Sequence, residues 1–317
     1  MPHPSPSSHE SYCFERGIDP KKRSQLGANY TDAATIMRII NPVIVEPLAA
    51  EWEAAKRIIA GRVALYEKGG KGSKNALQEA QGAFIAYLER LKSFKVLDPA
   101  CGSGNFLYLA LRALKDLEHK ANLEAEQLGL HHQVSIEVSP ANVLGIELNP
   151  YAAELARVTV WIGEIQWMLK NGYPIRKNPI LQPLDHIENR DALLSTGSAG
   201  ILPAAGETPA IQKSNLFDEA QWPVVDAIIG NPPFLGDKKM RGELGDKYTE
   251  ALRKCYADRV PGGADLVTYW FEKAHAQIEA GHSPSLPFTL CRINSYANII
   301  YFLTSKYLYI SAYIICW

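Results

Sequence analysis

The stretch that decides the fold is VLDPACGSGNFL, residues 96–107. It begins as a short apolar strand, passes through a turn with glycine at positions 102 and 104, and continues into an apolar helical pattern. Glycine lets the backbone approach a ligand closely, and the N-terminus of the following helix offers unpaired N–H groups. A nicotinamide or flavin dinucleotide site would need a third glycine at position 107. The chain has Leu107 there, which disfavours such a cofactor.

Short apolar runs and helical patterns alternate around this stretch. Strands are expected at residues 94–97, 142–146 and 224–229, with helices between them through residue 118 and over 151–169. Alternating strands and helices predict an α/β fold, with a mostly parallel sheet covered by helices on both faces. Helical periodicity over residues 32–92 predicts a helical region before the sheet.

Two further motifs occur at the ends of predicted strands. The sequence LGIELNP, residues 144–150, places Glu147 at a strand end, where a carboxylate can accept hydrogen bonds from both ribose hydroxyls of a nucleoside. The sequence VDAIIGNPPF, residues 225–234, ends a strand in Asn231 followed by two prolines, which cannot continue a ladder and which stiffen the backbone. Open α/β sheets bind ligands at their carboxyl edge, so we expect both side chains at one site.

Together these motifs resemble the S-adenosylmethionine-dependent N6-adenine DNA methyltransferases. The likeness is to the large bacterial restriction-modification enzymes of the type IIG kind, whose cofactor motifs precede a target recognition domain. It covers residues 14–281, where five motifs occur in that family's order. The resemblance implies a class I methyltransferase (Rossmann-like) core, S-adenosyl-L-methionine as the cofactor and double-stranded DNA as the partner.

The resemblance also assigns roles to residues. It implies that the cofactor is bound by Tyr30, Thr31, Asp98, Ala100, Gly102, Gly104, Phe106, Glu147 and Asp191. The segment 27–31 would touch the methionine part, Glu147 the ribose, and Asp191 the adenine amino group. The catalytic residues would be Asn231, Pro232, Pro233 and Phe234.

In this family pattern the Asn231 side-chain oxygen and the Pro232 carbonyl would accept the two N6 hydrogens, while Phe234 would stack on the base. Adenine N6 lies inside the duplex, so the target base must be extruded, at a cost of a few kcal/mol. The sulfonium methyl is already electrophilic, so the chemistry requires positioning of the acceptor and needs no metal.

Composition limits the partners that the chain can bind. With 317 residues and 47% apolar content, the chain can bury a large core in one large domain or two. Its 33 Lys and Arg against 34 Asp and Glu give a net charge of −1. Any DNA affinity therefore requires a local basic face. The charged segment 237–259 has seven Lys and Arg against five Asp and Glu, so we expect only weak, salt-sensitive DNA binding by this chain alone.

Cysteine usage and hydropathy predict the compartment. The five cysteines are scattered and form no C-x-x-C pair, which indicates a reducing compartment and no structural metal. Residues 1–15 lack the apolar stretch of a secretory signal, and the apolar run 299–317 is interrupted by Thr304, Ser305 and Lys306. We therefore expect a cytoplasmic protein without a membrane partner.

Three regions are expected along the chain. Residues 1–92 form the helical region, residues 93–285 the catalytic core with a flexible insertion at 195–213, and residues 286–317 an atypical tail.

The tail holds eight of the thirty aromatic residues and only two charged ones. Either a buried strand pair or a foreign, out-of-frame tail would explain this shift, and the composition favours the second. The remaining sheet strands and the recognition domain are then missing, so the chain resembles a piece of a longer enzyme that neither recognises a DNA sequence nor methylates DNA at a useful rate alone.

Two alternatives to DNA methylation stay open. The same Asn-Pro-Pro-aromatic arrangement suits any planar amide or amine nitrogen, so the acceptor could be a protein glutamine or an RNA adenine. An inactive remnant, which binds the cofactor or nothing, is the second alternative. Phe234 in place of tyrosine and the length of the upstream helices favour DNA.

Overall fold

A seven-stranded sheet lies at the centre of the computed structural model, which describes residues 31–69, 73–130, 136–173, 183–196 and 217–279 and the backbone of three further strands. The strand order is β3-β2-β1-β6-β7-β8-β9. The bounds are β1 (Val96–Asp98), β2 (Val143–Glu147), β3 (Ile187–Asn189), β6 (Ala227–Gly230), β7 (Pro287–Asn294), β8 (Ala297–Thr304) and β9 (Tyr313–Ile315). In this sheet β3, β2, β1, β6 and β7 pair in parallel, whereas β8 pairs antiparallel with both of its neighbours.

Helices cover both faces of this sheet, as the alternating pattern predicts. One face carries α3 (Ala33–Ile40), the π-helical turn η1 (Asn41–Val45), α4 (Glu46–Lys68), α5 (Ser73–Ser93), α6 (Asn105–Gln127) and α7 (Pro150–Lys170). The other carries α8 (Asp237–Leu244), α9 (Asp246–Cys255) and α10 (Leu266–Glu279), together with a hairpin of β4 (Leu194–Thr196) and β5 (Phe217–Glu219). A short helix, η2 (Pro140–Asn142), precedes β2.

The strands show why two layers of helices are needed. Successive side chains of a strand point to opposite faces. Val96 belongs to the core under α3–α7, whereas its neighbour Leu97 belongs to the core under α8–α10. On β6, Ala227 and Ile229 likewise face the first core and Ile228 the second. Because these residues are all fully buried, leaving either face bare would expose a continuous apolar surface.

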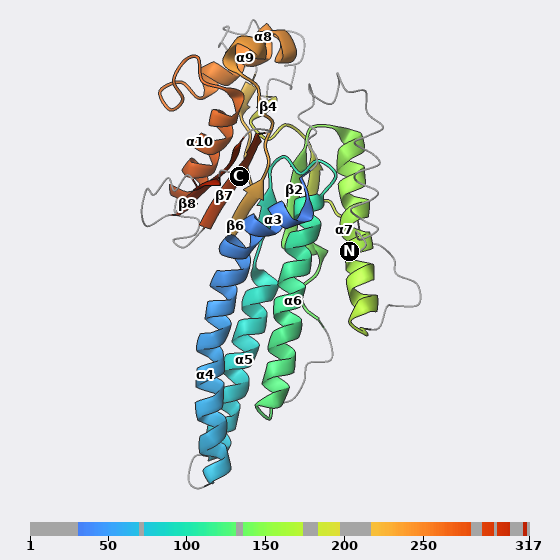
Figure 1. Ribbon diagram of the computed structural model, residues 1–317, viewed down its shortest axis with the longest axis vertical. Coiled ribbons are helices and arrows are strands. Elements are labelled where there is room, and N and C mark those ends of the chain that lie inside the picture. Colours follow the sequence, from blue (N-terminus) through green and yellow to red (C-terminus); the bar gives the residue numbers. More distant parts are fainter. Residues whose placement is uncertain are drawn as a thin grey trace, which may run out of the picture.

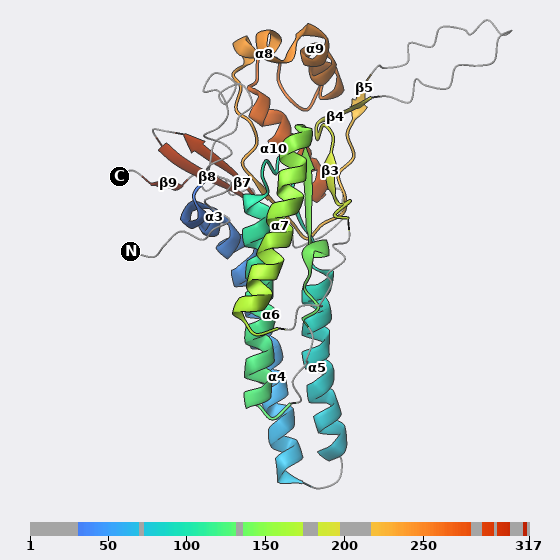
Figure 2. The same ribbon diagram turned by 90° about the vertical axis from the view of Figure 1, so that its right-hand side faces the viewer.

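The N-terminal helices project from one end of the molecule. Helices α4 and α5 form a long antiparallel pair beside α6, and α8 and α9 lie at the opposite end (Figures 1 and 2). The run Ala33–Lys68 is long and apolar enough, by length and composition, to cross a membrane. Its apolar side chains Ile36, Ile40 and Ile44 are instead buried in the core of this structure.

Two polar contacts fix the N-terminal helices to the sheet. The Asn142 side-chain amide donates to the carbonyls of Leu91 and Phe94 at 2.9 Å, which ties the end of α5 to the start of β2. Asp226, just before β6, accepts a 2.8 Å hydrogen bond from the Lys95 backbone N–H and pairs with Arg90 at 2.8 Å. The start of β1 is thereby held next to the start of β6.

The structure of the tail contradicts the expectation that the sheet has no further strands. Residues 287–294 form β7, which pairs in parallel with β6 through Ile228 and Phe288, and β8 returns beside it as an antiparallel strand. The aromatic and β-branched residues that shift the composition here are those that strands favour. The expected absence of strands beyond β6 is therefore wrong, whereas the proposed region boundaries stay predictions.

A close approach between α6 and α7 gives a test of this packing. A Cβ on Gly163 of α7 would lie 2.2 Å from the Tyr108 ring of α6, so Gly163→Ala should destabilise the protein by about 1–3 kcal/mol. Gly61→Ala is the matched control, because Gly61 is an exposed residue of α4 with open space around it and should gain about 0.5–1 kcal/mol. Thermal unfolding followed by circular dichroism measures both. Equal midpoints for the two variants would contradict the packing of α7 on α6.

Candidate active site

The loop between β1 and α6 is held in a tight turn. The Asp98 Oδ1 atom accepts a 3.0 Å hydrogen bond from the Ala100 N–H, and the Gly104 N–H donates to the Cys101 carbonyl at 2.8 Å. Gly104 has φ +87°, and a Cβ there would lie 2.9 Å from the Ala156 Cα atom of α7. Gly102 has φ +53° with open space where its Cβ would be, so this part of the loop can receive a ligand against the backbone.

Glu147 joins the loops that follow β1 and β2. Its Oε2 atom accepts a 2.9 Å hydrogen bond from the Gly102 N–H, and its Oε1 atom accepts one of 2.8 Å from the Asn149 N–H. Burial raises the pKa of the Glu147 carboxyl, although these N–H donors act in the opposite direction. Each carboxylate oxygen has further lone pairs, so Glu147 can accept more hydrogen bonds from a ligand.

Asp98 is the most buried carboxyl of this site. Its side chain is 1% exposed, and burial raises the pKa of Asp98 to about 8. The Oδ2 atom has no hydrogen-bond partner among the described residues. A Cβ at position 230 would lie 2.6 Å from the Asp98 Oδ1 atom, so only glycine fits where β6 passes this carboxyl. The carboxyl ends of β1 and β6 are therefore in close contact.

Asn231 follows directly on β6, at the same edge of the sheet. Its Oδ1 atom is buried and has no hydrogen-bond partner in the described part of the chain. Its Nδ2 atom donates to the Thr31 Oγ1 atom at 3.4 Å. Pro232 is buried, and Pro233 and Phe234 are half-buried. The motif thus presents an open acceptor oxygen on a stiff backbone.

Asp191 lies after β3, next to the Glu147 loop. Its Oδ1 atom accepts hydrogen bonds from the N–H groups of Leu193 at 2.7 Å and Leu194 at 3.2 Å. The Tyr248 hydroxyl of α9 also hydrogen-bonds the Asp191 side chain. Asn189, at the end of β3, donates to the Glu147 carbonyl at 2.8 Å. These contacts connect the end of β3 with the end of β2 and with α9.

The structure therefore places most of the sequence-predicted site residues along one edge of the sheet. Those at the ends of β1, β2, β3 and β6 are Asp98, Ala100, Gly102, Gly104, Glu147, Asp191, Asn231, Pro232, Pro233 and Phe234. Thr31 reaches this edge from the segment before α3. Phe106 is instead 5% exposed and packs in the core beneath α3–α7, and Tyr30 lies outside the described residues.

Two residues near the site are not among those predicted from the sequence. Tyr248 lies 57 positions after Asp191 in a charged helix, so only tertiary structure reveals its hydrogen bond with that residue. Leu148 directly follows Glu147 and is 68% exposed, unusual for a leucine beside a buried carboxyl. The position of Leu148 directly after Glu147 was the available clue, because an apolar residue that follows a strand-end acid can pack on a planar ligand.

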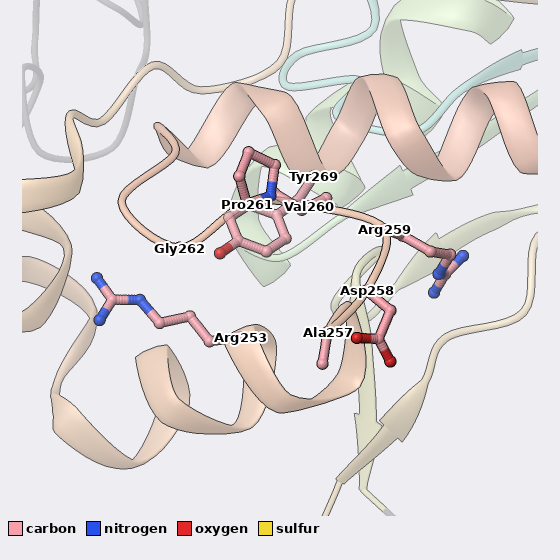
Figure 3. Close-up of a pocket in the computed structure, with 8 residues that line it drawn as sticks. All are labelled: Arg253, Ala257, Asp258, Arg259, Val260, Pro261, Gly262 and Tyr269. Atoms are coloured by element: carbon pink, nitrogen blue, oxygen red, sulfur yellow. The ribbon is translucent and has the colours of Figure 1, made fainter.

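A pocket of about 480 Å³ lies elsewhere, at the connection between α9 and α10 (Figure 3). It is lined by Arg253, Ala257, Asp258, Arg259, Val260, Pro261, Gly262 and Tyr269, none of which is a predicted site residue. The two arginine side chains point in opposite directions in Figure 3. Arg253 pairs with Asp237, and Arg259 pairs with Glu219, so the pocket presents no unpaired guanidinium to an anion.

Comparison with known proteins shows the family of this chain. Residues 74–295 match the family model described as MmeI, DNA-methyltransferase domain. DNA methyltransferase A of Bacillus subtilis is 26% identical over 255 residues, which cover 79% of this chain and 24% of that protein.

A solved structure has the same fold. It is that of the type IIL restriction-modification enzyme MmeI in complex with DNA, with a TM-score of 0.57 and 23% identity over 89% of this chain and 32% of that one. The chain thus spans about a quarter to a third of the length of these proteins. Since the family model matches well over half of its residues, the chain belongs to the family of MmeI DNA-methyltransferase domains.

Proposed function

We propose that this chain transfers a methyl group from S-adenosyl-L-methionine to the N6 atom of an adenine in DNA. The observation that carries the proposal is the Asn231 Oδ1 atom, buried and without a partner among the described residues, at the end of β6. A buried acceptor that lacks a donor is costly unless a ligand supplies one. An exocyclic amino group supplies such an N–H.

The residues around the β1 loop suit a charged nucleoside as the cofactor. Glu147 already has both oxygens oriented by backbone N–H groups, so its free lone pairs can accept ribose hydroxyls. The unpartnered Oδ2 atom of Asp98 suits a cationic group, and the exposed Leu148 suits the flat face of a purine. S-adenosyl-L-methionine combines these features and supplies a methyl group that is already electrophilic.

On the acceptor side, the residues hold the amino group in line with the methyl group and accept hydrogen bonds from both of its N–H groups, which localises the lone pair on the nitrogen. Asn231 Oδ1 accepts one N–H hydrogen bond and the Pro232 carbonyl accepts the other. Proline at positions 232 and 233 has no N–H to compete for these acceptors and keeps the turn rigid. The half-buried Phe234 supplies an aromatic face for the base. The reaction then depends on positioning.

DNA is proposed as the substrate because the relatives named above are DNA methyltransferases or restriction-modification enzymes. The acceptor can be identified with substrates that require little base extrusion. A DNA oligonucleotide with a mispaired adenine lowers the cost of flipping, so it reports on the pocket without requiring strong duplex recognition. With labelled cofactor, we expect the chain to form N6-methyladenine slowly in this DNA, detected by mass spectrometry, whereas ordinary duplex DNA should stay almost unmodified because the chain binds it weakly. Transfer only to a matched RNA, or only to a glutamine peptide, would contradict the proposal.

The cofactor site is tested by Glu147→Ala. Loss of the charge-assisted hydrogen bonds should weaken S-adenosyl-L-methionine binding by about 1–3 kcal/mol in titration calorimetry. Glu154→Ala is the control, because this glutamate is a 71% exposed residue of α7 that pairs only with Arg157 among the described contacts. Unchanged affinity in a folded Glu147→Ala protein would remove Glu147 from the site.

The acceptor site is tested by Asn231→Ala. This variant should lose methyl transfer to the mispaired adenine by at least about a hundredfold and bind the cofactor nearly as the unaltered chain does, because in the proposed arrangement Asn231 contacts the acceptor and not the cofactor. Asn75→Ala, at an exposed position of α5, should change neither quantity. Transfer by Asn231→Ala at the normal rate would mean that the Asn-Pro-Pro-Phe segment is only a turn.

The raised pKa values predict a pH dependence of cofactor binding. Below its pKa of about 8 the Asp98 carboxyl holds a proton, and the pKa of Glu147 is raised in the same direction by burial. A cationic cofactor binds the ionised form, so affinity should rise from about pH 6 to about pH 8, with protons released on binding. Calorimetry in buffers of different ionisation enthalpy measures this release. The Asp98→Asn variant should flatten the rise, and an affinity independent of pH in the unaltered chain would contradict the assignment.

A further inference from the structure

The Asn231 carboxamide has a chemical ambiguity that the proposed reaction must resolve. Its two ends are nearly equal in size, but one is an acceptor oxygen and the other a donor NH₂ group. Only the oxygen can accept an N–H of the substrate amino group. A carboxamide turned by 180° would direct a donor at a donor. The turn of the backbone at Pro232 fixes where the side chain begins but leaves this rotation open.

One described contact distinguishes the two ends. The Asn231 Nδ2 atom donates to the Thr31 Oγ1 atom at 3.4 Å, between residues 200 positions apart in the sequence. With the donor end engaged in this way, the Oδ1 end is directed to the side where it has no partner among the described residues. Thr31 is itself 5% exposed, so solvent competes little for its hydroxyl.

Thr31 is held in place by the start of α3. The next residue, Asp32, caps this helix by accepting a 3.0 Å hydrogen bond from the Thr35 N–H. The helix then buries Ile36, Ile39 and Ile40 in the core. Movement of the Thr31 backbone would therefore require the cap or this apolar face to shift. Both partners of the contact are therefore restrained. The start of α3 restrains Thr31, and the two prolines that follow Asn231 restrain its backbone.

We propose that Thr31 is a positioning residue that orients the Asn231 carboxamide with its oxygen toward the acceptor amino group. This inference rests on the proposed function and changes the role that the sequence resemblance implies for Thr31, from contact with the methionine part of the cofactor to support of the acceptor site. The N-terminal helical region then supports the acceptor chemistry through Thr31, which immediately precedes the cap of α3.

The contact is tested first without any reaction. The chain is labelled with ¹⁵N-asparagine, and the Asn231 carboxamide signals are identified by their absence in Asn231→Ala. Thr31→Val keeps the shape and removes the hydroxyl, so the hydrogen-bonded Asn231 amide proton should move upfield and exchange faster with solvent. Thr31→Ser keeps the hydroxyl and should preserve both properties. Asn231 signals that are identical in Thr31→Val and in the unaltered chain would overturn the inference.

Kinetics then separate positioning from cofactor binding. With the mispaired adenine substrate, Thr31→Val should lower kcat by about tenfold, the equivalent of one hydrogen bond, with an unchanged Kd for S-adenosyl-L-methionine. Thr31→Ser should restore most of the rate. A weaker Kd with unchanged kcat would make Thr31 a cofactor ligand and overturn the inference. No transfer by the unaltered chain, together with the expected amide signals, would contradict the proposed function while the Thr31–Asn231 contact stands.

Discussion

A buried carboxyl at the end of β1 is the constraint on which the rest of the site depends. Asp98 is almost completely buried, and this burial raises the pKa of its carboxyl to about 8. The fold tolerates this cost because β6 approaches closely with Gly230, where any side chain would collide with Asp98. This close approach sets the spacing between the β1 loop and Asn231. The cofactor side and the acceptor side of the proposed reaction are therefore positioned by the same contact.

The N-terminal helices stabilise that arrangement from outside the sheet. Asp226 joins the starts of β1 and β6 through Lys95 and Arg90, and Asn142 joins the end of α5 to the start of β2. These contacts are at the amino edge of the strands, whereas the site is at the carboxyl edge. Because a strand of three or four residues has few ladder bonds of its own, fixing one edge limits movement at the other. The long N-terminal helices thus restrain strands that are too short to be held by their own ladder hydrogen bonds.

Local sequence patterns were sufficient for part of this structure and insufficient for the rest. The glycine turn, the strand-end Glu147 and the Asn-Pro-Pro segment have short-range signals, since each depends on backbone rules that act over a few residues. The Tyr248 contact with Asp191 and the Thr31 contact with Asn231 join distant segments, and no local pattern predicts them. The role of Phe106 stays a prediction. The family motif places it beside the cofactor, and in this structure its side chain packs in the core beneath α3–α7.

The strand β7 shows how composition can mislead about topology. A run rich in aromatic and β-branched residues after α10 suggested foreign sequence, yet this composition is what a strand beside β6 requires. The family match also extends to residue 295, through the whole of β7. Without β7, the backbone of β6 would form an open sheet edge directly beside Asn231, where competing strands could pair. Coverage of that edge by β7 therefore protects the segment on which the acceptor chemistry depends, and it makes the tail part of the site's support.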